Sequence, residues 1–156
     1  MMRTTIALLG AMLLAGLVLT GGGCRTSAIT QRSEAAENQG QAASKIPVVS
    51  HGEEVNIKEH LTTGKTTLVD FYSEYCPGCM MLAPELDKLV TKRSDIAVVK
   101  VDVNRPDVQG QIDWDSPVVQ QYAIDSLPHL VIFDPEGKQI ASGEQALDEV
   151  VRWLKG

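Results

Sequence analysis

The sequence predicts an α/β fold with a central mixed β-sheet flanked by helices, and three observations support this prediction. Strand-like runs alternate with helical segments from residue 46 onward, an order typical of parallel strands. Near the end of the chain, two strand-like runs are joined by the short turn Asp134–Gly137, which predicts an antiparallel hairpin. The 156 residues, 44% of them hydrophobic, suit a single domain with a packed core.

The first half of the predicted domain contains two strands and two helices. Ile46–Val49 is a short apolar run that indicates a strand, and Val55–Leu61 indicates a short helix. Thr66–Tyr72, with the sequence TTLVDFY, has the composition of a buried strand. Apolar residues then follow helical spacing from Cys79 to Val90. Pro84 interrupts this helix, and we expect a kink there.

The second half continues the alternation and ends with the hairpin and a helix. The strands include a pair that the turn at Asp134–Gly137 joins as a hairpin, the short helix has Ser116 as its N-cap, and an amphipathic helix closes the chain. The predicted elements are strands at Ile96–Val103, Leu130–Phe133 and Gln139–Ser142, and helices at Ser116–Tyr122 and Ala146–Leu154.

The amino-terminal 23 residues have the pattern of a signal peptide. Arg3 precedes an uncharged apolar run, and small residues follow it before Cys24. The segment resembles a bacterial lipoprotein signal, which implies that Cys24 carries a lipid, although Gly21 stands where that family usually has Leu. A cleaved soluble form or a retained anchor is the alternative. In each case we expect the domain to lie outside the cytoplasm, periplasmic or at the cell surface.

Residues 24–44 are predicted to be a flexible tether between the anchor and a domain that spans residues 45–156. This segment is rich in Gln, Ser, Ala, Glu and Asn, with Ile29 as its one large aliphatic residue. It cannot bury enough apolar area to offset the entropy lost on ordering. A short amphipathic helix is the alternative.

Composition also excludes some classes of function. The formal net charge is −6, which argues against a general nucleic-acid binder, because such proteins need a basic face. Three cysteines are too few for a small disulfide-stapled scaffold. Nothing in the sequence indicates a bound cofactor, and nothing suggests more than a monomer.

The motif Cys76-Pro77-Gly78-Cys79 lies between a predicted strand and a predicted helix. Free N–H groups and the helix dipole at a helix N-terminus favour a thiolate there. The second cysteine lies one turn further on, so the pair can cycle between dithiol and disulfide. Three alternatives remain: half of a zinc site, a structural disulfide, and two inert thiols. A zinc site would need two further ligands, and the three histidines do not form a second close pair, so we predict no metal.

Residues 66–90, TTLVDFYSEYCPGCMMLAPELDKLV, resemble the active-site segment of thioredoxin, and the likeness continues through VVKVDVN (98–104) and SLPHLVIFDPEGK (126–138). The resemblance covers residues 46–156 and implies the thioredoxin fold. It implies that Cys76 attacks substrate, that Cys79 resolves the mixed disulfide, and that Asp70 is the buried acid beneath them. Asp70 could alternatively reach solvent at a strand end.

The resemblance also implies further site residues. Pro128 matches the family's cis-proline opposite the disulfide, with a trans proline as the alternative. Lys100 matches a lysine that faces the buried acid, or is an ordinary surface lysine. The residues expected to contact substrate are Tyr75, Pro77, Gly78, Leu127 and His129.

Four departures from the usual thioredoxin pattern bear on function. Tyr75 replaces the usual Trp, and Pro77 and Gly78 exchange the usual order Gly-Pro. Met80 replaces a positive charge, which removes one electrostatic aid to a thiolate. Residues 104–117 form a longer connection than usual. The strongly reducing character of thioredoxin therefore cannot be carried over to this chain.

Three functions follow as hypotheses. The first is a membrane-tethered thiol–disulfide oxidoreductase that reduces other exported proteins with electrons from a membrane or periplasmic thiol donor. The second is the same chemistry in the opposite direction, as a disulfide donor or isomerase. The third is a binding module on a thioredoxin scaffold with structural cysteines, against which the combination of Cys76, Cys79, Asp70 and Pro128 argues.

Overall fold

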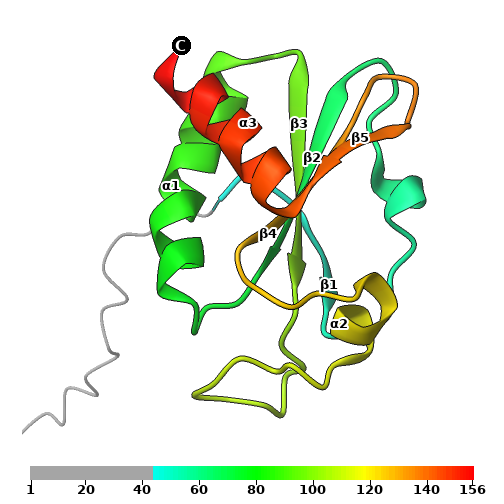
Figure 1. Cartoon of the computed structure of the whole chain (residues 1–156), viewed down its shortest axis with the longest axis vertical. Coiled ribbons are helices and arrows are strands. Elements are labelled where there is room, and N and C mark those ends of the chain that lie inside the picture. The colour runs from blue at the N-terminus through cyan, green and yellow to red at the C-terminus, as the bar shows by residue number, and fades with distance from the viewer. Residues whose placement is uncertain (1–43) are drawn as a thin grey trace, which may run out of the picture. The chain divides into compact units, whose positions relative to one another are not determined.

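The computed structural model describes residues 44–156, and nine elements follow one another in that part of the chain (Figure 1). Their order agrees with the predicted order of strands and helices. The elements are β1 (Val48–His51), the 3-10 helix η1 (Ile57–His60), β2 (Thr66–Tyr72), α1 (Pro77–Lys92), β3 (Ile96–Asp102), α2 (Pro117–Tyr122), β4 (His129–Phe133), β5 (Gln139–Ser142) and α3 (Gly143–Lys155).

The five strands form one mixed sheet in the order β1-β3-β2-β4-β5. β3 pairs in parallel with both β1 and β2, whereas β4 pairs antiparallel with β2 and with β5. This is the predicted mixed sheet. β2 is the central strand of the sheet and is mostly buried. The chain leaves the carboxyl end of β2 and then forms α1.

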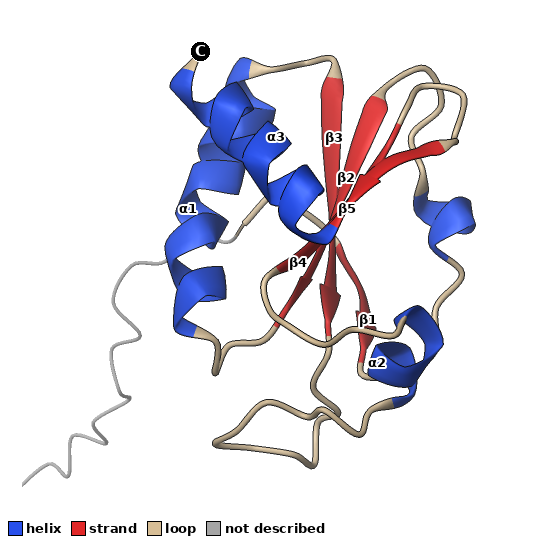
Figure 2. Ribbon diagram, in the orientation of Figure 1, coloured by secondary structure: helices blue, strands red, loops and turns tan. Residues whose placement is uncertain are grey.

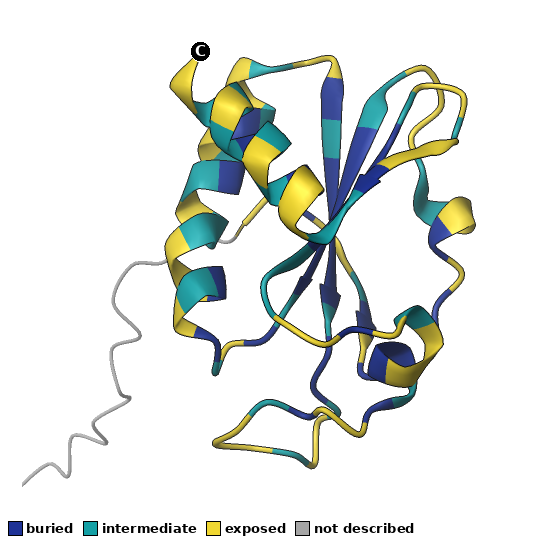
Figure 3. Cartoon of the chain, viewed as in Figure 1, coloured by how far each residue is buried: buried dark blue, intermediate teal, exposed yellow. Residues whose placement is uncertain are grey.

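Helices cover both faces of the sheet, with α1 and α3 on one face and α2 and η1 on the other (Figure 2). Alternate residues of each strand enter one of two apolar clusters, because successive side chains of a strand point to opposite faces. On the α1 and α3 face, Leu68 and Ile132 pack with Leu86 and Val150. On the other face, Phe71 packs in the cluster that contains Val118. Buried positions accordingly run along the strands in Figure 3.

Some element boundaries differ from the prediction. β1 begins at Val48 rather than Ile46, because Pro47 has no N–H for the ladder and contributes only its carbonyl, which accepts a hydrogen bond from Lys100 N at 2.9 Å. Ile46 instead packs in the core. α1 begins at Pro77, two residues before the predicted helical spacing, and it continues through Pro84 to Lys92, two residues beyond Val90.

Ser116 occupies the N-cap position of α2, as predicted, but its hydroxyl makes no capping bond. The side chain is fully buried, and its Oγ has no hydrogen-bond partner among the described residues. α3 begins at Gly143, one turn before the predicted apolar stripe, because its first residues are not buried. Within residues 44–156, no helix has the length and apolarity needed to cross a membrane. The predicted signal segment, Cys24 and most of the tether lie outside the described residues.

Candidate active site

Cys76 and Cys79 form a disulfide at the N-terminus of α1, with their Cα atoms 5.3 Å apart. The chain leaves β2 at Tyr72, and Cys76 N donates a hydrogen bond to Ser73 O at 3.1 Å. Cys76 is the N-cap of α1, and its Sγ accepts a hydrogen bond from Cys79 N at 3.2 Å. The first sulfur therefore lies where the helix amides favour negative charge. Pro77 fits the first helical position, which needs no N–H donor.

The loop before β4 packs against the turn between the two cysteines. The Leu127–Pro128 peptide bond is cis, the geometry that the resemblance implies. A Cβ built on Gly78 would lie 3.3 Å from Pro128 Cδ and 4.0 Å from Cys76 Sγ. Gly78 therefore allows Pro128 to approach the disulfide closely. Leu127 is partly buried and packs against the cluster on the α2 face.

Asp70 is a buried acid on the face of β2 that α1 covers. It is 1% exposed, and it shares this face with Leu68 because the two residues are two positions apart along the strand. Neither carboxylate oxygen has a hydrogen-bond partner among the described residues. Burial raises the pKa of Asp70 to about 7, and the charge of Lys100 lowers it in part. The carboxyl can thus gain and lose a proton near neutral pH, and the alternative that Asp70 reaches solvent is excluded.

Lys100 lies beside Asp70 in the sheet but is turned toward an aromatic ring. The two residues are register partners in β2 and β3. Lys100 is only 8% exposed, so it is not an ordinary surface lysine. Its Nζ lies 4.1 Å from the centre of the Tyr72 ring, a cation–π contact. Sequence reasoning missed Tyr72, although the two-residue period of β2 places it on the same face as Asp70.

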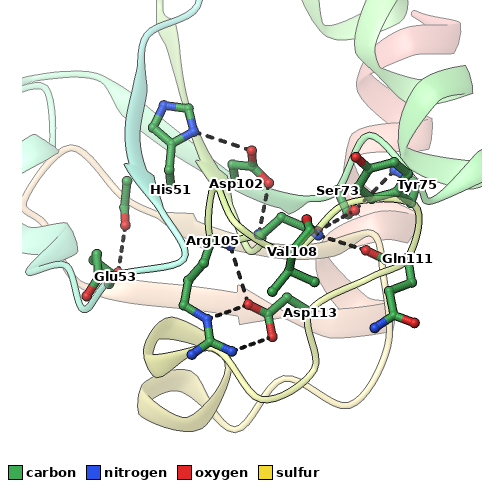
Figure 4. Close-up of polar contacts among 11 residues, drawn as sticks. His51, Glu53, Ser73, Tyr75, Asp102, Arg105, Val108, Gln111 and Asp113 are labelled. Carbon is green, nitrogen blue, oxygen red and sulfur yellow. Dashed lines mark hydrogen bonds and ion pairs between the residues drawn. The ribbon is translucent and has the colours of Figure 1, made fainter.

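A buried polar pair connects the active-site turn to the long loop between β3 and α2 (Figure 4). Ser73 Oγ donates to Asn104 Oδ1 at 2.7 Å and accepts from Tyr75 N at 3.1 Å. Ser73 and Asn104 are 0% and 5% exposed. This pair fixes the residue that precedes Cys76, and sequence reasoning missed it as well.

Tyr75 stands beside the first cysteine and is partly buried. A hydrogen bond to Glu74 raises the pKa of its hydroxyl, and one from the backbone of Gly110 lowers it. The hydroxyl, which the usual Trp lacks, thus lies within reach of the long loop. Tyr75 and that loop enclose one side of the active-site surface.

His129 contacts the sheet rather than the disulfide. Its ring lies edge-on to Phe71, with centroids 5.9 Å apart, and its Nε2 is 3.3 Å from Ser142 Oγ. Burial lowers the pKa of His129, whereas the charge of Asp125 raises it. Within residues 44–156, no hydrogen bond joins His129 to either cysteine. The structure therefore brings together Cys76, Cys79, Gly78 and Pro128. It places Asp70 on the sheet face that α1 covers and His129 on the opposite face.

Together, the fold and the site define an α/β domain with a disulfide at a helix N-terminus, an opposing cis-proline and a buried acid, the combination suited to thiol–disulfide exchange. The family model described as Thioredoxin matches residues 48–156. The chain belongs to the thioredoxin family, and its fold is the thioredoxin fold.

Several curated proteins are similar in sequence to this chain. A thiol:disulfide interchange protein TxlA homolog of Synechocystis sp. is 36% identical over 92 residues, which cover 56% of this chain and 46% of that protein. A thioredoxin of Chlamydia caviae is 32% identical over 101 residues, which cover 64% of this chain and 88% of that protein. A protein disulfide-isomerase of Hordeum vulgare is 29% identical over 129 residues, which cover 80% of this chain and 22% of that protein.

This chain therefore spans less than half of the TxlA homolog and about a fifth of the isomerase. Among solved structures, a mutant thioredoxin from Halobacterium salinarum is 24% identical, with a TM-score of 0.48, and the match covers 74% of this chain and 94% of that one.

Proposed function

We propose that this protein is a thiol–disulfide oxidoreductase that reduces disulfides in other extracytoplasmic proteins through Cys76 and Cys79. The observation that carries the proposal is the disulfide at the N-terminus of α1, together with the buried carboxyl of Asp70, which lies on the sheet face that α1 covers and has no hydrogen-bond partner among residues 44–156. The helix end stabilises a thiolate at Cys76. Asp70 supplies a group whose pKa of about 7 suits proton exchange with the resolving thiol.

The reaction transfers two electrons in two exchange steps. The Cys76 thiolate attacks one sulfur of the substrate disulfide, forms a mixed disulfide and releases the first substrate thiolate. Cys79 then loses its proton to Asp70 and attacks the Cys76 sulfur, which releases the second substrate thiolate. The substrate gains two electrons, and the pair ends as the disulfide seen in the structure. Pro128 and Gly78 leave the edge of this disulfide beside an extended backbone, where a substrate peptide can lie.

We place this activity outside the cytoplasm, on a monomer tethered by a lipid at Cys24. The support is the sequence of residues 1–24, with its basic start, apolar run and small residues before the cysteine. A membrane or periplasmic thiol carrier returns the pair to the dithiol form, because each turnover leaves it oxidised. The partners are oxidised exported proteins, and nucleic acid is not among them.

Substrate trapping tests the assignment. The full-length Cys79→Ser variant is produced in the cells that normally make the protein. It is expected to accumulate mixed disulfides with other proteins, because attack by Cys76 continues and resolution stops. These adducts should disappear on reduction and should not form when Cys76 is also replaced by Ser. Equal capture by the double variant would show that Cys76 is not the nucleophile.

A disulfide donor or isomerase is the second candidate, and two observations favour it. Met80 is 44% exposed at a position where thioredoxins usually carry a cation, and several similar proteins are named protein disulfide-isomerase. Equilibration with glutathione buffers separates the two directions. A potential below about −250 mV supports a reductant, and one above about −180 mV supports a donor or isomerase.

A further inference from the structure

The loop between β3 and α2 lies at the same end of the sheet as the start of α1 (Figure 1), where Cys76 and Cys79 form the disulfide. Asn104 holds it from within. The Asn104 side chain accepts from Ser73 and donates through Nδ2 to Val108 O at 3.2 Å and to Gln111 O at 2.8 Å. These bonds fix the curvature of the loop and its position against the active-site turn.

An ion pair fixes the far part of the same loop. Arg105 Nε and Nη2 donate to the two carboxylate oxygens of Asp113 at 2.6 and 3.0 Å, and Asp113 is 4% exposed (Figure 4). The stem of Arg105 packs against Gly52, where an added Cβ would lie 2.6 Å from Arg105 Cγ. The Arg105 charge is therefore satisfied within the loop, and the loop forms a preformed wall.

A cavity of about 350 Å³ lies between this wall and the residues that precede Cys76. Tyr75, Pro106 and Val108 contribute apolar surface to its lining, while Glu74 and Asp102 contribute carboxylates. Both oxygens of Asp102 already have partners: Oδ2 lies 3.3 Å from His51 Nδ1, and Oδ1 accepts a hydrogen bond from Asn104 N at 3.0 Å. Glu74 is exposed, and although the Tyr75 hydroxyl donates a hydrogen bond to its carboxylate, the two carboxylate oxygens keep further acceptor sites for a ligand.

The lining suits a long basic side chain. Lysine and arginine place their aliphatic stems along apolar surface while the charged group reaches a polar partner. The apolar lining residues would contact the stem, and the Glu74 carboxylate would pair with the cation. The lining arginine already pairs with Asp113 through Nε and Nη2, and this carboxylate offsets its attraction for an acidic ligand.

We propose that this cavity is a substrate subsite, and that it selects substrate proteins with a lysine or arginine close to the disulfide cysteine. The inference rests on the proposed function, because the mixed disulfide with Cys76 is what brings the substrate chain beside Tyr75. The subsite is lined by Tyr75, which precedes the reactive cysteine in the chain, and by residues of the unusually long loop.

The test uses reduced full-length protein and disulfide-bonded peptides in two sets of three. In one set the varied residue lies two positions before the cysteine, and in the other it lies two positions after it. That residue is Lys, Gln or Glu, and the second-order rate constant for a single turnover, in which the protein dithiol becomes a disulfide as the peptide is reduced, is measured for each peptide. The Lys peptide is expected to react about two- to fivefold faster than the Gln peptide, the range of an exposed ion pair. The advantage should shrink as ionic strength rises.

Two variants of Glu74 locate the preference. Glu74→Gln should remove the preference for Lys, and Glu74→Lys should transfer it to the Glu peptide. Because Glu74 is exposed, both variants should fold. Asp125→Asn is the matched control, since Asp125 is an exposed acid near Pro128 that does not line the cavity; this variant should keep the preference.

The outcomes separate the two proposals. Reduction of all three peptides at equal rates in both sets would overturn the subsite and leave the proposed function intact. A Lys preference that survives Glu74→Gln, or that Asp125→Asn removes equally, would also overturn it, because general attraction to an acidic surface would then suffice. Failure to reduce any peptide would overturn the oxidoreductase function and the subsite with it.

Discussion

When Asp70 is replaced by Asn, the oxidised protein should gain stability relative to the wild type as pH rises. The carboxyl is 1% exposed and lacks a hydrogen-bond partner among the described residues, and its pKa is raised from 3.8 to about 7. The folded state therefore favours the protonated acid. Each pH unit between the folded and unfolded pKa values corresponds to about 1.4 kcal/mol. The full effect of ionising Asp70 is thus about 4 kcal/mol.

The sign of the effect follows from proton linkage. Below pH 3.8 the acid is protonated in both states, and its contribution to stability is fully present. As pH rises from 3.8 to about 7, the unfolded chain releases a proton that the folded protein retains, so the wild-type protein loses stability. The amide introduced by Asp70→Asn does not titrate. The difference between the two free energies of unfolding, variant minus wild type, should therefore increase as pH rises through this window.

Urea denaturation of both proteins at a series of pH values from 4 to 9 measures the effect, with fluorescence of Trp114 and Trp153 as the probe. No reductant is added, so the disulfide stays closed and the cysteines do not titrate. Burial of the introduced amide adds a pH-independent amount to the difference between the two free energies of unfolding. Only the change of this difference with pH is therefore interpreted. Asp107→Asn, at an exposed acid of the long loop, is the control. A wild-type-to-variant difference that stays flat from pH 4 to pH 9 would refute the reasoning.

Two further predictions concern the surroundings of the disulfide and the support of the long loop. In the reduced protein, Met80→Lys should speed alkylation of Cys76 by iodoacetamide at pH 7 by about two- to fivefold, because an exposed cation near the thiolate favours its charged form; an unchanged rate would contradict this electrostatic argument. Gly52→Ala should lower the urea-derived free energy of unfolding by more than the roughly 1–2 kcal/mol of a left-handed backbone alone, because the new methyl would meet Arg105. Gly64→Ala shares the positive φ but meets nothing within 4 Å, so equal losses in the two variants would contradict the role of that contact.

The order of strands and helices can be predicted because the hydrophobic pattern is strong. The prediction for Thr66–Tyr72 is correct at both ends, since five consecutive buried residues mark a central strand. Prediction is weaker at the sheet edge, where Pro47 moves the start of β1. The missing capping bond of Ser116 is also beyond prediction, because side-chain geometry decides whether a serine at the N-cap position makes that bond.

The cysteine pair is visible in the sequence because its members are three residues apart at a strand–helix junction. The contacts around it are less visible. Ser73 and Asn104 are separated by 31 residues, and neither residue type signals an active site. Only the fold brings the end of β2 beside the end of β3 and turns these common polar residues into a support for Tyr75. Such pairs are set by strand register, which local patterns do not fix.

The arrangement of Lys100 explains how a buried acid stays available for proton exchange. Strand register places Lys100 beside Asp70, where a direct ion pair would hold the carboxylate in its charged form. Instead the ammonium lies over the Tyr72 ring at 4.1 Å. The attraction of Lys100 for the carboxylate is therefore only partial, and desolvation dominates the pKa of Asp70. An acid that was fully paired would have no proton to exchange near neutral pH, and an acid with no cation nearby would hold its proton more tightly. The Tyr72–Lys100 contact keeps Asp70 between these limits.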